Sequence, residues 1–287
     1  MANKMKKEEL LQSYLFILPA AIILLVFFLF PIVYAFVLLF LKLISRFAVK
    51  AVVGAQNYTD VLSDRKLIAA FFNTLKYVAI VVPIQTFLAM LIASVLNSNI
   101  KGKNTFRIIY FLPTLTSSSA LTLIFMFMFN QEGLINMFLK VFGVQGKNWL
   151  DDVDFVLKVI MAMNIWSTVP FFMTIYLAGL QDVPATQYEA ASIDGANAWQ
   201  RFLYITVPNL RPITAFVVIM GLIGCFQVFD QAYIVSKGTG GPGTATLTLV
   251  LLIYQYAFAG KPNMGRATAL AFILALFIMG VTYLAKR

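Results

Sequence analysis

The sequence contains no histidine and a single cysteine, Cys225. Without an imidazole, the chain has no Ser-His-Asp or Cys-His relay and no histidine metal ligand. One thiol cannot form an internal disulfide or a multi-thiolate zinc site, and Cys225 stands in an apolar run, as a small buried hydrophobe would. We therefore expect no catalytic residue, no metal site and no cofactor on this chain.

Charged residues are scarce as well. They make up 12% of the 287 residues, against about 25% in a soluble domain, and hydrophobic residues make up 61%. The mean hydropathy is +0.85. The formal net charge is +10, but the lysines and arginines are scattered over short loops, which suits anionic lipid head groups better than nucleic acid. This composition predicts a protein dissolved in lipid.

Six apolar runs are long enough to cross about 30 Å of hydrocarbon as helices. The first run is too long for a signal peptide and lacks a small-residue cleavage site, so we expect it to be retained. A seventh run, Leu247 to Phe258, is too short to span and predicts an interfacial or re-entrant helix. The sequence predicts an all-α integral membrane protein, a single transmembrane domain over residues 1–287, with spans at about 14–40, 72–96, 106–129, 156–180, 213–235 and 267–285.

The orientation of the spans follows from their basic flanks. Six spans place both termini on one side of the membrane. Basic residues flank the first run, the short turn after the second run and the end of the last, which favours a cytoplasmic location for both termini. These residues are Lys4, Lys6, Lys7, Lys101, Lys103, Arg107, Lys286 and Arg287.

The loop between the fourth and fifth spans, residues 181–212, carries the most local information. Pro184 suits the first position of a short helix, and Gly195 can end that helix in a left-handed cap. A second short helix follows, and Pro208 and Pro212 then break the chain before the fifth span. Small side chains and one carboxylate, Glu189, suit docking to a partner, whereas the alternative interpretation is a solvated turn.

At these residues the chain resembles the permease subunits of binding-protein-dependent ATP-binding-cassette (ABC) sugar importers, of the maltose and glycerol-phosphate group. The loop matches that family's EAA signature, in which a glycine follows the EAA triplet and an I-x-[LV]-P string closes the loop. Further matches extend over nearly the whole chain. The matching strings are Tyr14 to Pro19, Phe30-Pro31, Asn57-Tyr58, Asn73-Thr74-Leu75, Glu189-Ala190-Ala191, Asp194-Gly195-Ala196, Trp199 to Phe202, Ile205 to Pro208, Gly240-Gly241-Pro242 and Tyr256-Ala257-Phe258.

The resemblance implies a MetI-like, type I ABC importer permease fold in the cytoplasmic (inner) membrane of a bacterium or archaeon. It implies a heterodimer with a second permease, two cytoplasmic ATPase subunits that hold ATP and Mg, and an extracytoplasmic binding protein that delivers a carbohydrate. The absence of a G-x-x-x-x-G-K-[ST] phosphate loop fits ATP hydrolysis on the partners. The implied ATPase-coupling residues are Glu189, Ala190, Ala191, Asp194, Gly195 and Pro208.

Polar residues inside the spans are the candidates for a substrate pathway, because an ionised group at the membrane centre costs about 2.5 to 3.5 kcal/mol. Asp230 and Gln227 are three residues apart, and on one helix they would share a face. Amide, hydroxyl and carboxylate groups beside aromatic rings suit a sugar, whereas the alternative is hydrogen bonding between helices. The candidates are Asn164, Ser167, Thr168 and Phe171 in the fourth span and Gln227 and Asp230 in the fifth.

Other functions stay open at this point. Another polar solute, such as glycerol phosphate, would suit a permease of this group equally. An autonomous channel or secondary carrier would need paired acids or two matched halves, and the sequence contains neither. An intramembrane enzyme would need a nucleophile with a base, or a metal cluster, which the absence of histidine disfavours.

Overall fold

The structure is a computed structural model that describes residues 2–43, 49–98 and 101–286. Contacts divide the chain into two compact units, one of Met1–Ser63 with Gln255–Phe272 and one of Asp64–Tyr254 with Ile273–Arg287. Within the described residues, five helices are long and apolar enough to cross a membrane, or six when one bent pair counts as a single span. The prediction of a six-span, largely α-helical membrane protein is confirmed, with the third span in two pieces.

The first unit begins with a long apolar helix and continues into a small hairpin. Apolar side chains are exposed along the helix between Tyr14 and Val37, as expected for a helix that contacts lipid or another protein chain. The hairpin is antiparallel and pairs Leu41 with Val52. The elements are α1 (Ala2–Leu24), the π-helix η1 (Leu25–Leu29), α2 (Phe30–Leu38), β1 (Leu41–Leu43), β2 (Val49–Val52) and α3 (Gln56–Leu62). The side chains of Lys4, Lys6 and Lys7 lie outside the described residues.

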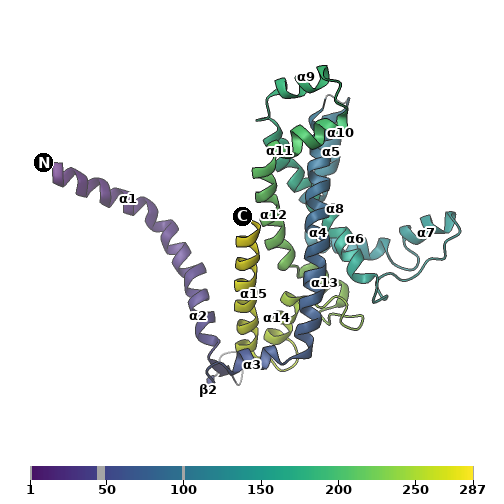
Figure 1. Cartoon of the computed structure of the whole chain (residues 1–287). Helices are drawn as coiled ribbons and strands as arrows, with labels where there is room; N and C mark the ends of the chain where they lie inside the picture. Colours follow the sequence, from purple (N-terminus) through teal and green to yellow (C-terminus); the bar gives the residue numbers. More distant parts are fainter. Residues whose placement is uncertain (1, 44–48, 99–100, 287) are drawn as a thin grey trace. The chain divides into compact units, whose positions relative to one another are not determined.

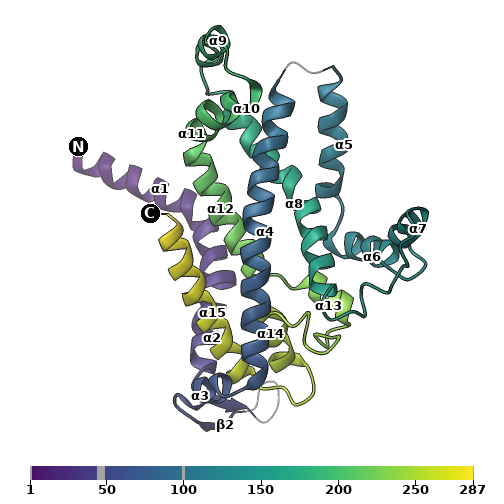
Figure 2. The same cartoon turned by 45° about the vertical axis from the view of Figure 1, so that its right-hand side comes forward.

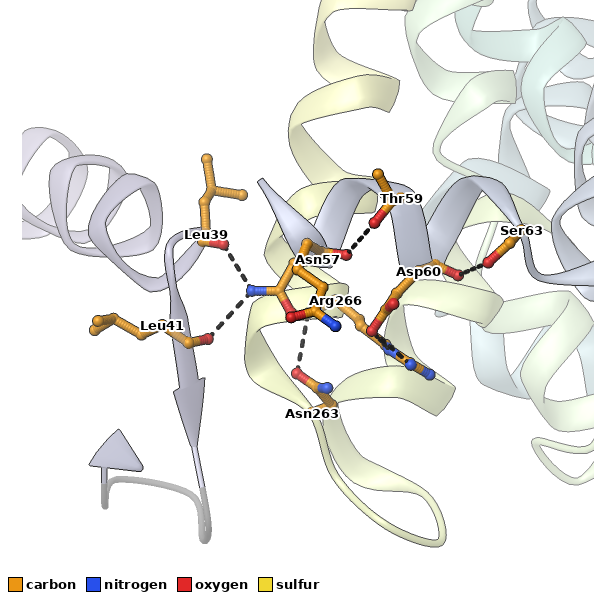
Figure 3. A network of polar contacts seen from close by, with 9 residues as sticks. Leu39, Leu41, Asn57, Thr59, Asp60, Ser63, Asn263 and Arg266 are labelled. Carbon is orange, nitrogen blue, oxygen red and sulfur yellow. Dashed lines mark hydrogen bonds and ion pairs between the residues drawn. The ribbon is translucent and has the colours of Figure 1, made fainter. Parts of the chain in front are cut away.

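Asn57 organises this hairpin (Figure 3). Its side chain is 3% exposed, and its Nδ2 donates to the carbonyls of Leu39 at 2.7 Å and Leu41 at 3.2 Å. On the same short helix, Asp60 forms an ion pair with Arg266 of α15 (Met264–Ala285), with Oδ2 and Nη2 2.7 Å apart. Side-chain bonds to backbone carbonyls and one ion pair therefore connect the parts of the first unit.

We expect Asn57→Ala to loosen β1. The substitution leaves the buried carbonyl of Leu39 without its donor, which costs about 1–3 kcal/mol. Amide hydrogen exchange over Leu41–Leu43 should accelerate by about tenfold, because 1.4 kcal/mol corresponds to a factor of ten. Ser63→Ala is the control, because the Ser63 hydroxyl bonds only within its own turn, to the Asp60 carbonyl. Unchanged exchange at β1 in Asn57→Ala would contradict this role.

The second unit is built on three long helices that run side by side in both views (Figures 1 and 2). They are α4 (Arg65–Asn97), α8 (Val156–Leu180) and α12 (Arg211–Phe226). Asp64 caps α4 by accepting a bond from the Lys66 amide at 2.8 Å. At 1.5 Å per residue, α4 is about 50 Å long and exceeds the hydrocarbon thickness. The buried core between these helices contains Ala89, Met173, Tyr176, Leu210 and Val217.

The third predicted span, 106–129, is not one helix, and this corrects the sequence analysis. It consists of α5 (Lys103–Leu115) and α6 (Ser118–Met128), whose axes differ by 101°. Thr116 has an extended backbone with φ −92° and ψ 139°, and Ser117 caps α6 by accepting a bond from the Ala120 amide. A serine N-cap favours the start of a new helix, which a count of apolar residues does not detect.

The fifth predicted span, 213–235, is also interrupted. Helix α12 ends at Phe226, Gln227 is its C-cap, and α13 (Asp230–Ser236) begins three residues later. Phe229 has φ −137° and ψ −62°, outside the helical region. Gln227 and Asp230 therefore do not share a face of one helix, and that part of the sequence analysis is wrong. Asp230 instead occupies the first turn of α13, where a carboxylate faces the free amides of a helix start.

The loop between α6 and α8 contains α7 (Leu134–Val141), and a buried asparagine ties its residues together. The Asn136 side chain is fully buried, and its Nδ2 donates to the carbonyls of Asn130, Gln131 and Lys147. Its Oδ1 accepts from the Trp149 ring nitrogen at 2.8 Å. This side chain satisfies backbone groups that no helix or strand pairs, so the loop has a defined conformation.

The Lys147–Asp152 pair makes this loop sensitive to acid. The two charges are 2.7 Å apart, and the hydrogen bond from Lys147, followed by the Asp154 amide, lowers the pKa of Asp152. Because the pKa of Asp152 is lowered in the folded protein, the Lys147–Asp152 pair stabilises the fold fully above the ordinary carboxyl pKa of about 3.9. That stabilisation is lost as the pH falls through the lowered pKa.

We therefore expect the loop to stay ordered near neutral pH and to loosen only below about pH 4. Trp149 lies beside Lys147, and its fluorescence can report the change once Trp166 and Trp199 are replaced by phenylalanine. In Asp152→Asn the acid transition should disappear. An identical transition in that variant would assign it to other carboxylates.

The short apolar helix predicted near Leu247 is α14 (Leu249–Phe258), and residues of α4 hold its start. Asn73 Nδ2 donates to the carbonyls of Thr244 at 2.7 Å and Leu247 at 3.0 Å. The Thr74 hydroxyl accepts from the Leu249 amide at 3.0 Å. These bonds fix the segment that follows Gly240-Gly241-Pro242 against the beginning of α4.

Candidate functional site

The loop between α8 and α12 lies at one end of the second unit (Figure 2), and its first element is α9 (Ala185–Ile193). Pro184 precedes the helix as its N-cap rather than as its first residue. At the other end Gly195 has φ +78°, and its amide donates to the Ser192 carbonyl while the Ala196 amide donates to the Ala191 carbonyl. This is the two-bond glycine cap that the spacing predicts, and it closes the helix on a residue without Cβ strain.

Helix α9 presents its surface away from the rest of the unit. None of its residues is buried. Glu189 and Ala190 are exposed, and within the described part of the chain Glu189 has no ion-pair partner. Ile193 is 87% exposed, which is unusual for an isoleucine outside lipid. A carboxylate, small alanines and an exposed isoleucine together form a surface suited to another protein.

Three side-chain hydrogen bonds attach α9 to the segment that leads into α12. Tyr188 and Thr206 hydroxyls lie 2.9 Å apart, and Asn209 donates to the Gln187 side chain at 2.9 Å. The Arg201 guanidinium donates to the Ser192 hydroxyl at 2.8 Å. Because all three bonds join α9 to residues 201–209, which lead into α12, a displacement of α9 moves the start of α12 with it.

The rest of the loop folds back onto the helices through a few apolar side chains. Phe202 is buried in the core between α4 and α8, and Trp199 stacks on it with ring centroids 5.2 Å apart. Leu203 stays half exposed. Pro208 lies in a short helix that continues directly from the π-helix before it, since Thr206 and Val207 are both helical. The elements are α10 (Ala198–Arg201), the π-helix η2 (Phe202–Thr206) and α11 (Val207–Asn209).

A second candidate site is a cavity of about 350 Å³ between α8, α13 and the bend that joins α5 to α6. All four pathway candidates of the fourth span line it. They share the cavity with hydroxyls at the bend and with an amide of α13. The lining includes Asn164, Ser167, Thr168 and Phe171 of α8, Thr114, Thr116 and Ser118 of the bend, and Gln231 of α13.

The polar atoms around this cavity differ in whether they already have partners. Thr168 Oγ1 lies 2.8 Å from both the Gln85 Oε1 and the Asn164 carbonyl. Gln231 donates to the Ser118 hydroxyl at 3.1 Å. The Asn164 Oδ1, in contrast, is buried and has no hydrogen-bond partner among the described residues. An unsatisfied acceptor beside a cavity is available to a ligand hydroxyl.

The candidates of the fifth span lie elsewhere. Gln227 and Asp230 are exposed and are not part of the cavity lining. Beside Asp230 in sequence, Phe229 belongs to an aromatic cluster with Tyr233 and Tyr254, with ring centroids 5.0 to 5.4 Å apart. Asp230 thus follows a residue of an aromatic cluster, while Asn164 lines the polar cavity.

The sequence analysis did not identify Gln231, which lines the cavity, or Gln85, which accepts a hydrogen bond from the lining residue Thr168. Gln85 of α4 is 1% exposed, and a Cβ at Gly221 of α12 would lie 2.5 Å from its Nε2, so Gln85 sits where α4, α8 and α12 meet. The signal was an amide in the middle of an apolar run, which is costly unless it is paired. Gln231 was overlooked because it follows the more conspicuous Asp230.

The chain has close relatives of known type. Residues 85–287 match the family described as binding-protein-dependent transport system inner membrane component. The lactose transport system permease protein of Rhizobium radiobacter is 32% identical over 285 residues, which cover 98% of this chain and 95% of that protein. The trehalose/maltose transport system permease protein of Thermococcus litoralis is 32% identical, covering 96% and 94%. An arabinooligosaccharides transport system permease protein of Bacillus subtilis is 33% identical, covering 96% and 87%.

The fold is shared with a solved transporter. One chain of a bacterial alginate ABC transporter, crystallised with a periplasmic protein that carries an alginate pentasaccharide, superposes with a TM-score of 0.83 over 99% of this chain and 95% of that chain, at 21% identity. At that identity the likeness concerns the fold alone. The sequence match covers more than two thirds of the chain, and the chain belongs to the family of inner-membrane permease components of binding-protein-dependent ABC transport systems.

Proposed function

We propose that this chain pairs with a second, related permease and is driven by two cytoplasmic ATPase subunits that bind ATP and Mg. The observation that carries the proposal is α9, a helix without buried residues whose Glu189 is exposed and unpaired within the described chain. Ala190 and Ala191 allow close approach, and Glu189 offers a carboxylate to a basic residue of the ATPase. The chain itself carries no phosphate loop, so hydrolysis belongs to the partners.

The hydrogen bonds of α9 provide a route by which movement of the ATPases would be transmitted to the membrane-spanning helices. Asp194 and Gly195 end α9 in a rigid cap, so the helix moves as a unit. The Tyr188–Thr206 bond and the short helix at Pro208 carry that movement to the start of α12. Rocking of α8 and α12 would then expose the cavity to alternate sides of the membrane. This assignment places the loop, and with six spans both termini, in the cytoplasm.

A carbohydrate, delivered by an extracytoplasmic binding protein, is the solute that the cavity fits best. Asn164, Ser167 and Thr168 offer amide and hydroxyl groups that pair with sugar hydroxyls, and Phe171 offers a ring for an apolar sugar face. Gln227 and Asp230, which lie outside this cavity, stay candidates for another part of the pathway. The relatives named for lactose, trehalose/maltose and arabinooligosaccharides support the same substrate class.

Glycerol phosphate fits the cavity less well. The described side chains that line it are hydroxyl, amide, thioether, apolar and aromatic groups, without a lysine or arginine. A phosphate that is moved from water into such a site loses its hydration without gaining a cation, which costs several kcal/mol.

One experiment tests both the assembly of the transporter and the identity of its substrate. The tagged chain, expressed with its neighbouring genes, should copurify an ATPase and a second permease, and a thermal-shift screen of the neighbouring binding protein should identify a carbohydrate. Uptake of that carbohydrate should require all components. An isolated chain that transports solute alone would instead support a channel or secondary carrier.

A further inference from the structure

One groove of the second unit has no role in the function described so far. It has a volume of about 780 Å³ and lies between the end of α4, the helix α5 and the second half of α8. Its amide and guanidinium side chains come from the helix ends at the α9 side of the unit (Figure 2), and apart from the Thr174 hydroxyl its walls are apolar. It differs in this respect from the hydroxyl-rich cavity around Asn164.

The groove changes from polar to apolar along the helices. Arg107 is in the first turns of α5, and Phe111 and Leu112 follow one turn further. On α8, Gln181 follows the last helical residue, and Leu177 lies one turn before it. One helical turn is about 5.4 Å long. Both walls, α5 and α8, therefore change from polar to apolar side chains within that distance. This gradient matches an amphiphile, whereas a sugar carries hydroxyl groups all around its ring and has no separate apolar tail.

Arg107 supplies the charge at the polar end. Its Nε is buried and has no hydrogen-bond partner among the described residues. Gln181 and Asn97, which share the polar end, already bond to each other at 3.1 Å. A guanidinium that borders an apolar groove with an unpaired N–H is satisfied best by an anionic oxygen. The groove therefore suits a ligand that has an anionic group attached to an apolar tail.

We propose that the groove binds an anionic phospholipid. The phosphodiester accepts hydrogen bonds from Arg107, and an acyl chain lies along Phe111, Leu112 and Leu177. The placement in the cytoplasmic leaflet rests on the proposed function, because the groove opens at the end that carries the coupling helix α9. That leaflet contains the anionic lipids of the membrane, and the net charge of +10 favours them.

The test uses the purified transporter complex in nanodiscs of phosphatidylglycerol and phosphatidylcholine, with retained lipid counted by native mass spectrometry. Arg107→Gln should weaken retention of phosphatidylglycerol by about tenfold, the loss expected for one charge-assisted contact. Lys101→Gln is the matched control, because this exposed lysine removes the same charge nearby without lining the groove. Its retention should stay within about twofold of the unmodified complex.

A second variant protects the test against misfolding of the first. Leu112 is 54% exposed, so Leu112→Trp can fill the groove without disturbing the core, and it should also expel phosphatidylglycerol. Equal retention in both variants and the unmodified complex would overturn the proposal. So would displacement of the lipid by inorganic phosphate, or loss of the second permease from the Arg107→Gln complex with its lipid intact.

A further variant distinguishes failure of the lipid proposal from failure of the proposed function. A charge reversal at Glu189 should abolish uptake while phosphatidylglycerol retention stays unchanged. Loss of lipid in that variant would mean that the groove depends on the ATPase contact and not on Arg107.

Discussion

Glu189→Lys should reduce ATP-driven uptake by about a hundredfold. The variant places an ammonium where the contact with the ATPase requires a carboxylate, and losing one partner of such a charge pair costs about 2–5 kcal/mol. Because Glu189 is exposed and unpaired within the described chain, its replacement should leave the folded permease unchanged. Uptake into membrane vesicles and ATPase copurification measure the two consequences.

Glu132→Lys is the matched control for this experiment. It reverses the same charge at an exposed position in the loop between α6 and α8, remote in sequence from α9. Its uptake should stay close to that of the unmodified protein. Full uptake with normal ATPase copurification in Glu189→Lys would mean that α9 is a solvated turn and not the coupling element.

Asn164→Leu should raise the substrate concentration for half-maximal uptake by about tenfold or more. The replacement keeps the volume of the side chain but removes the buried Oδ1, which has no partner among the described residues and is available to a substrate hydroxyl. A substrate hydroxyl left without that partner costs about 1–3 kcal/mol. Transport assays over a range of substrate concentrations, on complexes with equal ATPase content, measure the change.

Ser167→Ala separates a substrate contact from a general effect on the cavity. The Ser167 hydroxyl also lines the cavity, but it already donates to the Asn164 carbonyl of its own helix at 3.0 Å. Its removal should change uptake by less than about threefold. Equal effects of the two substitutions would indicate that these residues serve packing between helices.

The loop between α8 and α12 could be predicted closely from the sequence because its signals are local. Gly195 after a short alanine-rich helix predicts a left-handed cap, and the structure has φ +78° there. The bond pattern of that cap depends only on residues within one turn. The start was predicted within one residue, since Pro184 is the N-cap and not the first helical position.

The breaks inside the spans could not be predicted from hydropathy. Thr116 and Gln227 stand in runs that remain apolar on average, although the backbone leaves the helix at each of them. Windows of about 20 residues measure transfer into lipid and not the direction of the helix axis. The local signals of the first break were Pro113 and the cap at Ser117, which stands among several serines.

Several residues in the strings that match the family form hydrogen bonds between segments that are distant in the sequence. Asn57 binds the hairpin carbonyls of Leu39 and Leu41. Asn73 binds the carbonyls of Thr244 and Leu247, 171 and 174 residues away. No periodicity links such positions, so their roles depend on tertiary structure. Gln85, buried where three helices meet, was missed for the same reason.

The most direct test of the central claim is uptake by proteoliposomes that contain this chain, its partner permease and the ATPases. With the carbohydrate-loaded binding protein outside and ATP inside, the account predicts accumulation of the carbohydrate that stops when ATP, the ATPases or the binding protein is omitted. Accumulation that persists without the ATPases, or that needs only this chain, would contradict it.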